Sequence, residues 1–172
     1  MTPQEFQTHY PRLIGWVRQT LAAHKSQARP VASFGFVRLP QYFSQALLEL
    51  TAVVSVDKVP VPPLSALGLT QFAAFEQGNY DGVTYLDTFF VKHHRATDER
   101  LFFHELIHVV QWRLLGPERF VASYAVGLEA LGYRDSPLEI MAYDAEEKFV
   151  RSSQPYDAEK LVAEQLRLIT YS

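Results

Sequence analysis

The chain has 172 residues, 48% of them hydrophobic and 13% aromatic, which is enough apolar material for the core of one domain. Its net charge of −3 gives no indication of binding to nucleic acid or to an acidic membrane. Because there is no cysteine, disulfides and thiolate metal sites are excluded, and any metal must be held by His, Asp, Glu or water.

The N-terminus, MTPQEFQTHY, lacks the basic start and the apolar run of a secretory signal. No stretch approaches the length of a membrane span, and no repeat or low-complexity tract divides the chain. We therefore expect a single domain over residues 1–172 in the cytoplasm, with neither a membrane nor nucleic acid as a partner.

The N-terminal part of the chain is typical of helices joined by proline-rich loops. Residues 3–25 predict an amphipathic helix, because apolar side chains recur at helical spacing at Phe6, Tyr10, Leu13, Ile14, Val17 and Leu21. A short helix over about 41–50 and an extended stretch over 53–63 are expected next. Three prolines between positions 60 and 63 argue against a central place in a sheet for that stretch.

The rest of the chain predicts one strand and four helices. Residues 82–92, GVTYLDTFFVK, are the best strand candidate because most of them are β-branched or aromatic. A helix follows over about 98–115, with Thr97 as its N-cap and Gly116 as its stop. Further helices are expected over about 117–130, 137–151 and 157–170, the last within a C-terminal extension over 152–172. The expected fold class is α+β, mostly helical, with a small sheet before the helix at 98–115.

One motif on that helix carries chemistry. His104 and His108 are four residues apart, so both imidazoles lie on one face of the helix, one turn apart. Two imidazoles placed in this way can bind one tetrahedral zinc ion. Glu105 projects beside them, where it can take a proton from a metal-activated water and pass it to a leaving group. This is the H-E-x-x-H pattern of zinc hydrolases.

The motif also has a plainer explanation, as core or solvent-facing histidines that match the pattern by chance. The flanking residues argue against chance, because the helix is apolar nearly all round and should be buried. Burial of two His and one Glu without partners costs several kcal/mol, and a metal ion provides the partner.

A catalytic zinc site usually has three protein ligands, and the third does not follow directly after His108. The best source is the helix that Pro137 begins. On that helix Glu139 and Glu146 share a face with Phe149 and Val150, which should point inward. Glu139 is the first candidate for the third ligand, Glu146 the second and Asp135 the third. The candidates that do not bind the metal can orient the histidines.

Glu139 has a competing role that needs no metal. Ser136 and Glu139 have the spacing of a capping box, in which the carboxylate bonds to the backbone of the cap residue. The sequence leaves the choice between ligand and cap open.

Three segments together make the chain similar to a known class. They are GVTYLDTFFV, LFFHELIHVVQW and SPLEIMAYDAE, and they cover about residues 80–150. The chain resembles the gluzincin-type zinc metallopeptidases, especially their minimal, single-domain forms, and the resemblance implies a zincin-like fold. Residues 1–75 contribute nothing to it.

The resemblance implies roles for several residues. Strand 82–92 would be the edge along which a substrate backbone lies, and Glu139 would be the third ligand. Gluzincins often carry an aspartate four residues after that glutamate, where this chain has Tyr143. Asp144 or Glu146 would then have to orient the ligand histidine. The family also uses a Tyr or His to steady the oxyanion, and Tyr124, Tyr133 and Tyr143 are candidates, of which we single out Tyr143.

Four other residues have possible roles near the site. His93 and His94 follow the strand and are expected to be solvated, with the rim of a cleft as the alternative. Gln111 lies on the face of His104 and can hydrogen-bond near the site. Trp112 is expected in the core.

The leading hypothesis is a zinc-dependent metallopeptidase that acts on a peptide or protein substrate, with Glu105 as general base. The first alternative is a catalytically inactive metal-binding module that holds a peptide or partner in the same cleft. The second is an interaction domain without metal. A terminal helix that covers the cleft and inhibits the enzyme is a further hypothesis.

Overall fold

Helix α1 (Pro3–His24) begins with a capping box in which Thr2 and Glu5 exchange hydrogen bonds between side chain and backbone. The computed structural model, which describes residues 2–170, thus confirms the predicted N-terminal helix. Ile14 and Val17, two of its apolar positions, are buried in the main core. The second helix, α2 (Gln45–Leu50), is shorter than the predicted 41–50, because Ser44 is its N-cap and Gln41 ends the separate 3-10 turn η3 (Leu39–Gln41).

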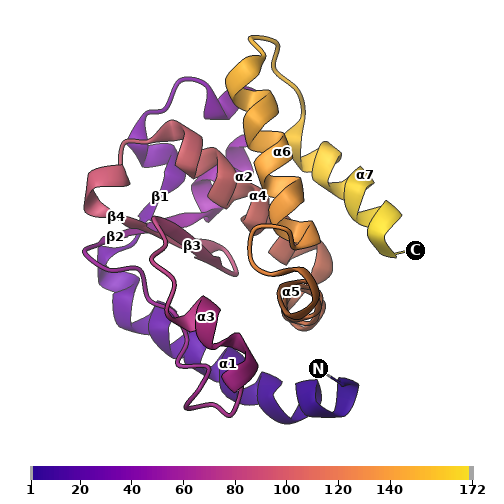
Figure 1. Cartoon of the computed structure of the whole chain (residues 1–172). Coiled ribbons are helices and arrows are strands. Elements are labelled where there is room, and N and C mark those ends of the chain that lie inside the picture. Colours follow the sequence, from indigo (N-terminus) through magenta and orange to yellow (C-terminus); the bar gives the residue numbers. More distant parts are fainter. Residues whose placement is uncertain (1, 171–172) are drawn as a thin grey trace.

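Four short strands form one sheet in the order β1-β2-β4-β3. They are β1 (Arg29–Pro30), β2 (Ala52–Val56), β3 (Gly82–Tyr85) and β4 (Thr88–Lys92). β2 and β4 are parallel, with Val53 opposite Phe89, whereas the pairs β1/β2 and β3/β4 are antiparallel. The sheet lies between α1 and the C-terminal helices (Figure 1), and β3 is one of its edges.

Two predictions about the sheet were wrong. The single strand expected over 82–92 is a hairpin, because Leu86 has a left-handed conformation (φ 59°) and turns the chain back. β2 is an interior strand between β1 and β4, although prolines follow it. The strand ends at Val56, before the first of those prolines, so no proline has to donate to the ladder.

Helix α4 (Glu99–Leu115) runs through the middle of the molecule, and every residue from Phe102 to Trp112 is buried. The predicted all-round burial of this helix is therefore confirmed. Its N-cap is Asp98 and not the predicted Thr97, because the Asp98 carboxylate accepts from two backbone N–H groups of the first turn. That carboxylate also suits the positive end of the helix dipole.

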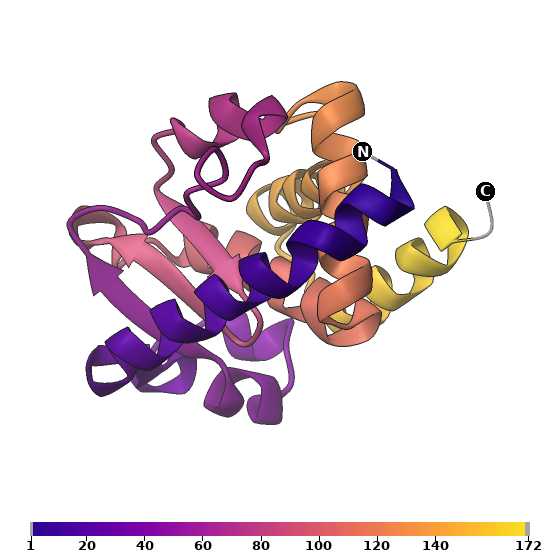
Figure 2. The same ribbon diagram turned by 90° about the horizontal axis from the view of Figure 1, so that it is seen from below.

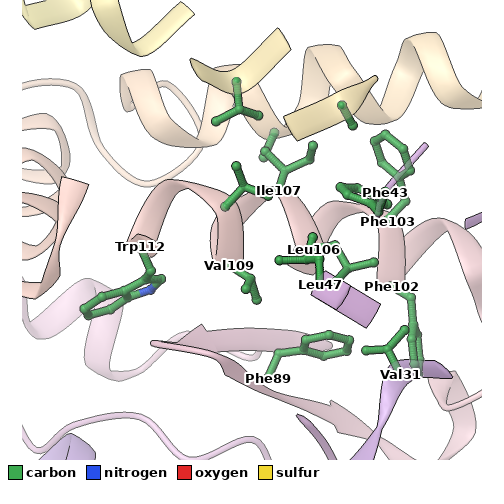
Figure 3. Close-up of a cluster of buried hydrophobic side chains, with 14 of the residues drawn as sticks. Val31, Phe43, Leu47, Phe89, Phe102, Phe103, Leu106, Ile107, Val109 and Trp112 are labelled. Atoms are coloured by element: carbon green, nitrogen blue, oxygen red, sulfur yellow. The ribbon is translucent and has the colours of Figure 1, made fainter. Parts of the chain in front are cut away.

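The two faces of α4 contact different layers. Figure 3 shows Phe102 and Val109 on the side of Phe89, a strand residue, whereas Ile107 lies on the opposite side. The rings of Phe102 and Phe89 are 5.1 Å apart and perpendicular. Because the segment 102–112 of α4 is enclosed on both sides, the polar side chains within it need specific hydrogen-bond or ion partners.

The remaining long helices are α5 (Pro117–Leu131), α6 (Pro137–Arg151) and α7 (Ala158–Thr170), and they confirm the three predicted C-terminal helices. α6 and α7 pack against α4. Phe149 of α6 is buried as predicted, but Val150 is 49% exposed. The prediction for Val150 was wrong because one residue turns a helix by about 100° and carries the next side chain off the inner face.

Shorter elements connect this framework: η1 (Lys25–Gln27), η2 (Val31–Phe34), η4 (Thr70–Phe72), α3 (Ala73–Glu76) and η5 (His93–Arg95). Leu64, Leu69 and Phe72 form a second, smaller hydrophobic cluster beside the main core. Figure 2 shows α1 lying across the face of the molecule that is seen from below. Within residues 2–170, none of the helices has both the length and the apolar character of a membrane span.

The fold class is thus α+β, mostly helical with a small four-stranded sheet, as the sequence predicted.

Candidate metal centre

His104 and His108 of α4 and Glu139 of α6 meet in one buried cluster. The two Nε2 atoms are 3.2 Å apart. One carboxylate oxygen of Glu139 lies 3.4 Å from Nε2 of His104, and the other lies 3.3 Å from Nε2 of His108. All three side chains are at most 5% exposed. The packing of α4 against α6 therefore brings together three of the predicted ligands.

These separations fit a tetrahedral ion. Ligand atoms bound to zinc at its usual distances, with tetrahedral angles between them, are about 3.3 Å apart. The Nε2–Nε2 separation and the two Glu139 contacts, each made by a different carboxylate oxygen, differ from that value by no more than about 0.1 Å. Moreover, Oε2 of Glu139 is buried without a hydrogen-bond partner in the described part of the chain. A buried carboxylate oxygen without a partner is costly, and a cation between the three side chains would satisfy it.

The other nitrogen of each histidine is held by a hydrogen-bond acceptor. Nδ1 of His104 lies 2.9 Å from a carboxylate oxygen of Glu146, and Nδ1 of His108 lies 2.8 Å from Oε1 of Gln111. The amide of Gln111 is itself oriented, because its Nε2 donates to the backbone oxygen of Leu138. Both Nδ1 atoms are therefore donors, so in the neutral rings both Nε2 lone pairs point into the cluster.

Glu146 thus takes the orienting position that Tyr143 leaves open, whereas Asp144 is exposed. Arg100 forms an ion pair with the same carboxylate and completes its surroundings. Asp135, the third candidate ligand, is also exposed and is not part of the cluster.

The capping-box alternative for Glu139 was wrong. Ser136 is the N-cap of α6, but its hydroxyl donates to the backbone of Tyr133 and makes no cap hydrogen bond. The carboxylate of Glu139 points away from the cap and accepts a hydrogen bond of 2.6 Å from the hydroxyl of Tyr124. Tyr124 therefore steadies Glu139, a role that the spacing of residues along the chain does not reveal.

The electrostatics of the cluster favour a positive charge at its centre. Burial lowers the pKa of His104, but the adjacent carboxylates of Glu139 and Glu146 outweigh it and raise this pKa to about 10. Burial raises the pKa of Glu139, yet the neighbouring His108 and His104 hold it well below its usual range. The pKa of Glu146 is lowered as well, by His104 and Arg100, against its own burial. Both carboxylates are therefore ionised at neutral pH, and they attract a cation.

Glu105 lies next to the cluster but has its own partner. Its Oε2 accepts a hydrogen bond of 2.6 Å from the hydroxyl of Thr84 in β3. The side chain is 3% exposed, and burial raises its pKa despite the two nearby imidazoles. The other oxygen, Oε1, faces Gly82 at the edge of the sheet. A carboxylate with a raised pKa and one free oxygen is suited to accept and release a proton.

Gly82 leaves the space that Glu105 occupies. A Cβ at this position would overlap Oε1 of Glu105 and lie only 2.9 Å from its Cδ. We therefore expect Gly82→Ala to displace the carboxylate from Thr84 and to lower the free energy of unfolding by about 1–3 kcal/mol, as for other overpacked sites. Denaturant unfolding of the two proteins measures this difference.

Gly15→Ala is the matched control, because a Cβ at Gly15 meets nothing within 4 Å and the residue lies inside α1. This control should gain up to about 1 kcal/mol from helix propensity. Equal stability changes in the two variants would contradict the proposed contact between Gly82 and Glu105.

Tyrosines surround the cluster on two sides. The ring of Tyr143 packs 4.7 Å from the ring of His104, but Tyr143 is not among the residues that line the adjoining cavity. Tyr133, Tyr124 and Tyr80 do line it. Burial, followed by the nearby carboxylates of Glu139 and Glu105, raises the pKa of Tyr133 well above its usual range. Tyr133 is therefore a neutral hydroxyl donor on the open side of the cluster.

A cavity of about 120 Å³ adjoins the cluster, and Glu105, His108 and Glu139 form one end of it. The rest of its wall comes from α1, from residues 62–85, and from α4 and α5. Trp112 lines it as well as packing in the core, where its ring stacks 4.0 Å from Phe120. His93 and His94 are exposed and are not among the lining residues.

Of the two terminal helices, only α1 lines this cavity. Helix α7 instead buries Ala158, Val162 and Leu166 in the main core. The hypothesis of inhibition by a terminal helix can therefore apply to α1, whereas α7 has the ordinary role of covering the core.

The sequence did not single out two of the residues around the site. Thr84, the partner of Glu105, looks like an ordinary strand residue, and Tyr80 lies in a loop. Comparisons of the chain with protein families, with curated proteins and with solved structures found no significant match.

Proposed function

We propose that this protein is a zinc-dependent metallopeptidase with a zincin-like fold. The observation that carries the proposal is the buried cluster of His104, His108 and Glu139, in which the two Nε2 atoms, and each Nε2 and its nearest Glu139 oxygen, are about as far apart as neighbouring ligands of a tetrahedral zinc ion. Glu105 adds a carboxylate that is open to the same cavity. Three ligands and a neighbouring carboxylate beside a cavity are the features of a catalytic rather than a structural zinc site.

Each of the chain's own residues then has a definite task. His104, His108 and Glu139 hold the ion, while Glu146 and Gln111 fix the orientation of the two imidazoles. A bound ion would supply an activated water and an electrophilic contact for the scissile carbonyl. Oε1 of Glu105 accepts the proton of the water and afterwards delivers it to the leaving amine, while Thr84 holds the other oxygen in place.

The developing negative charge on the carbonyl oxygen needs a hydrogen-bond donor. Tyr143, the residue singled out from the sequence, packs its ring against that of His104 and does not line the cavity, whereas Tyr133 does. We therefore assign the oxyanion contact to Tyr133, whose neutral hydroxyl can donate to it.

Strand β3 provides a place for the substrate backbone. The backbone N–H of Lys92 donates to the backbone oxygen of Asp81 across the β3/β4 pair. Along an antiparallel strand every second residue bonds to the same neighbour, so the backbone groups of Gly82 and Thr84 face the free edge of β3. The oxygen of Thr84 already accepts from the indole of Trp112. A peptide that adds to this edge would therefore pair at Gly82, directly beside Glu105.

A mixed-sequence peptide library tests the proposal. The zinc-loaded protein should cleave it, cleavage should stop when a chelator removes the metal, and added zinc should restore it. Mass spectrometry of the products measures the outcome. Stoichiometric zinc without cleavage of any peptide would overturn the enzyme proposal and favour the alternative, a metal-binding module that holds a peptide without cleaving it.

A further inference from the structure

The cavity beside the metal centre is built mainly from apolar side chains of three elements. Helix α1 contributes Leu13 and Val17, the segment between β2 and β3 contributes Leu69 and Phe72, and α5 contributes Ala125 and Leu128. Several of these residues belong to the second hydrophobic cluster, which lies beside the main core. The metal cluster and the second hydrophobic cluster therefore both contribute to the lining of the cavity.

The carboxylates and imidazoles of this lining lie in two places, and of the tyrosines that also line it, Tyr80, Tyr85 and Tyr124 already donate their hydroxyls to protein oxygens. Glu105, His108 and Glu139 form the metal end. Among the remaining lining residues, the ring of His9 contacts the backbone oxygen of Leu67 through Nδ1. A charged group inserted beyond the metal end would lose water and gain mainly apolar neighbours.

The size of the cavity matches a large side chain. Its volume is about 120 Å³. An engineered apolar cavity of about 150 Å³ in another protein binds benzene, so this space suits an aromatic ring or a branched aliphatic group. Protein interiors otherwise leave few voids larger than a water molecule, which makes an open apolar space beside a reactive centre a candidate for ligand binding.

We propose that the substrate is a peptide with a large apolar side chain next to the scissile bond, and that this side chain binds between α1, the 64–75 loop and α5. The inference rests on the proposed peptidase function. Its main support is that one cavity includes both the reactive groups and the apolar wall. The proposed general base and two proposed ligands line it together with the apolar side chains. A small side chain at that position would leave the apolar wall exposed to water. A charged side chain would lose its hydration there.

Ala125→Leu tests this inference because it adds bulk to the cavity wall. The matched control is Ala130→Leu, the same change at an exposed position of α5. Wild type should cleave a peptide with Phe at the selected position at least tenfold more efficiently than its Ala counterpart. In Ala125→Leu this preference should fall by about tenfold, whereas Ala130→Leu should keep it. An unchanged preference in Ala125→Leu would overturn the inference. If Ala125→Leu does not fold, Val121→Phe on the same helix replaces it.

A binding measurement separates this inference from the proposed function. N-acetyl-phenylalanine methylamide, added to the inactive variant Glu105→Gln, should shift the methyl NMR signals of Ala125 and Leu128, while N-acetyl-alanine methylamide should not. Shifts without hydrolysis by the wild type would refute the peptidase and retain the apolar site. Hydrolysis without shifts or preference would refute the apolar site and retain the peptidase.

Discussion

Glu105→Gln is expected to lower peptidase turnover by about 10²–10⁴-fold, the usual contribution of a general acid–base group. The amide is nearly the same size and can still pair with Thr84, but it cannot accept the proton of the attacking water. Glu105 is not one of the three clustered ligands, so bound zinc should stay near one ion per chain. Turnover on a cleaved peptide and elemental analysis of the same sample measure both quantities.

Two controls make this result specific. Glu164→Gln changes an exposed carboxylate of α7 and should leave turnover unchanged. Thr84→Val should leave zinc in place but reduce turnover, because the Glu105 carboxylate loses the hydroxyl that holds it. Full turnover of Glu105→Gln would refute its role as general base, and loss of zinc from that variant would mean that Glu105 is a ligand.

Glu139→Gln and Glu146→Gln should affect zinc very differently, although both residues lie on α6 and contact His104. Glu139 is a proposed ligand, so its variant should lose near-stoichiometric zinc, as should His104→Ala and His108→Ala. Glu146 orients the imidazole from its other nitrogen, so its variant should bind zinc about 10–100-fold more weakly. Elemental analysis and competition with a chelator of known affinity measure these effects.

The exposed residue Glu147 of the same helix provides the matched control, and Glu147→Gln should bind zinc like the wild type. A protein that retains zinc in Glu139→Gln but loses it in Glu146→Gln would have Glu146 as its third ligand. If the wild type took up no zinc at micromolar concentration, the metal site itself would be refuted. Thermal unfolding adds an independent readout, because an ion that binds only the folded chain at 1,000 times its Kd stabilises it by about 4 kcal/mol.

The order and type of the long helices could be predicted because their signals are local. Helical spacing of apolar residues indicated α1 and the C-terminal helices, and Pro137 marked the first residue of α6. The buried state of α4 also followed from its own residues, which are apolar nearly all round.

Local signals were insufficient where a turn or a neighbour decides the outcome. Most residues of 82–92 are strand formers, and their division into two strands becomes visible only in the left-handed conformation of Leu86. For the same reason β2 could be placed inside the sheet only once its partners were known, because pairing depends on distant segments.

In the candidate site, the sequence by itself determined the relation of His104, Glu105 and His108, because helix geometry fixes residues that are one to four positions apart. Only the tertiary structure could bring Glu139 into the cluster, leave Asp135 outside it and place Glu146 at Nδ1 of His104, because these positions depend on how α6 packs against α4. The same holds for Thr84, Tyr124 and the apolar cavity, which residues from distant parts of the chain create together. The residues of the motif can therefore be identified from the sequence, whereas the residues that contact them depend on long-range packing, which no local pattern predicts.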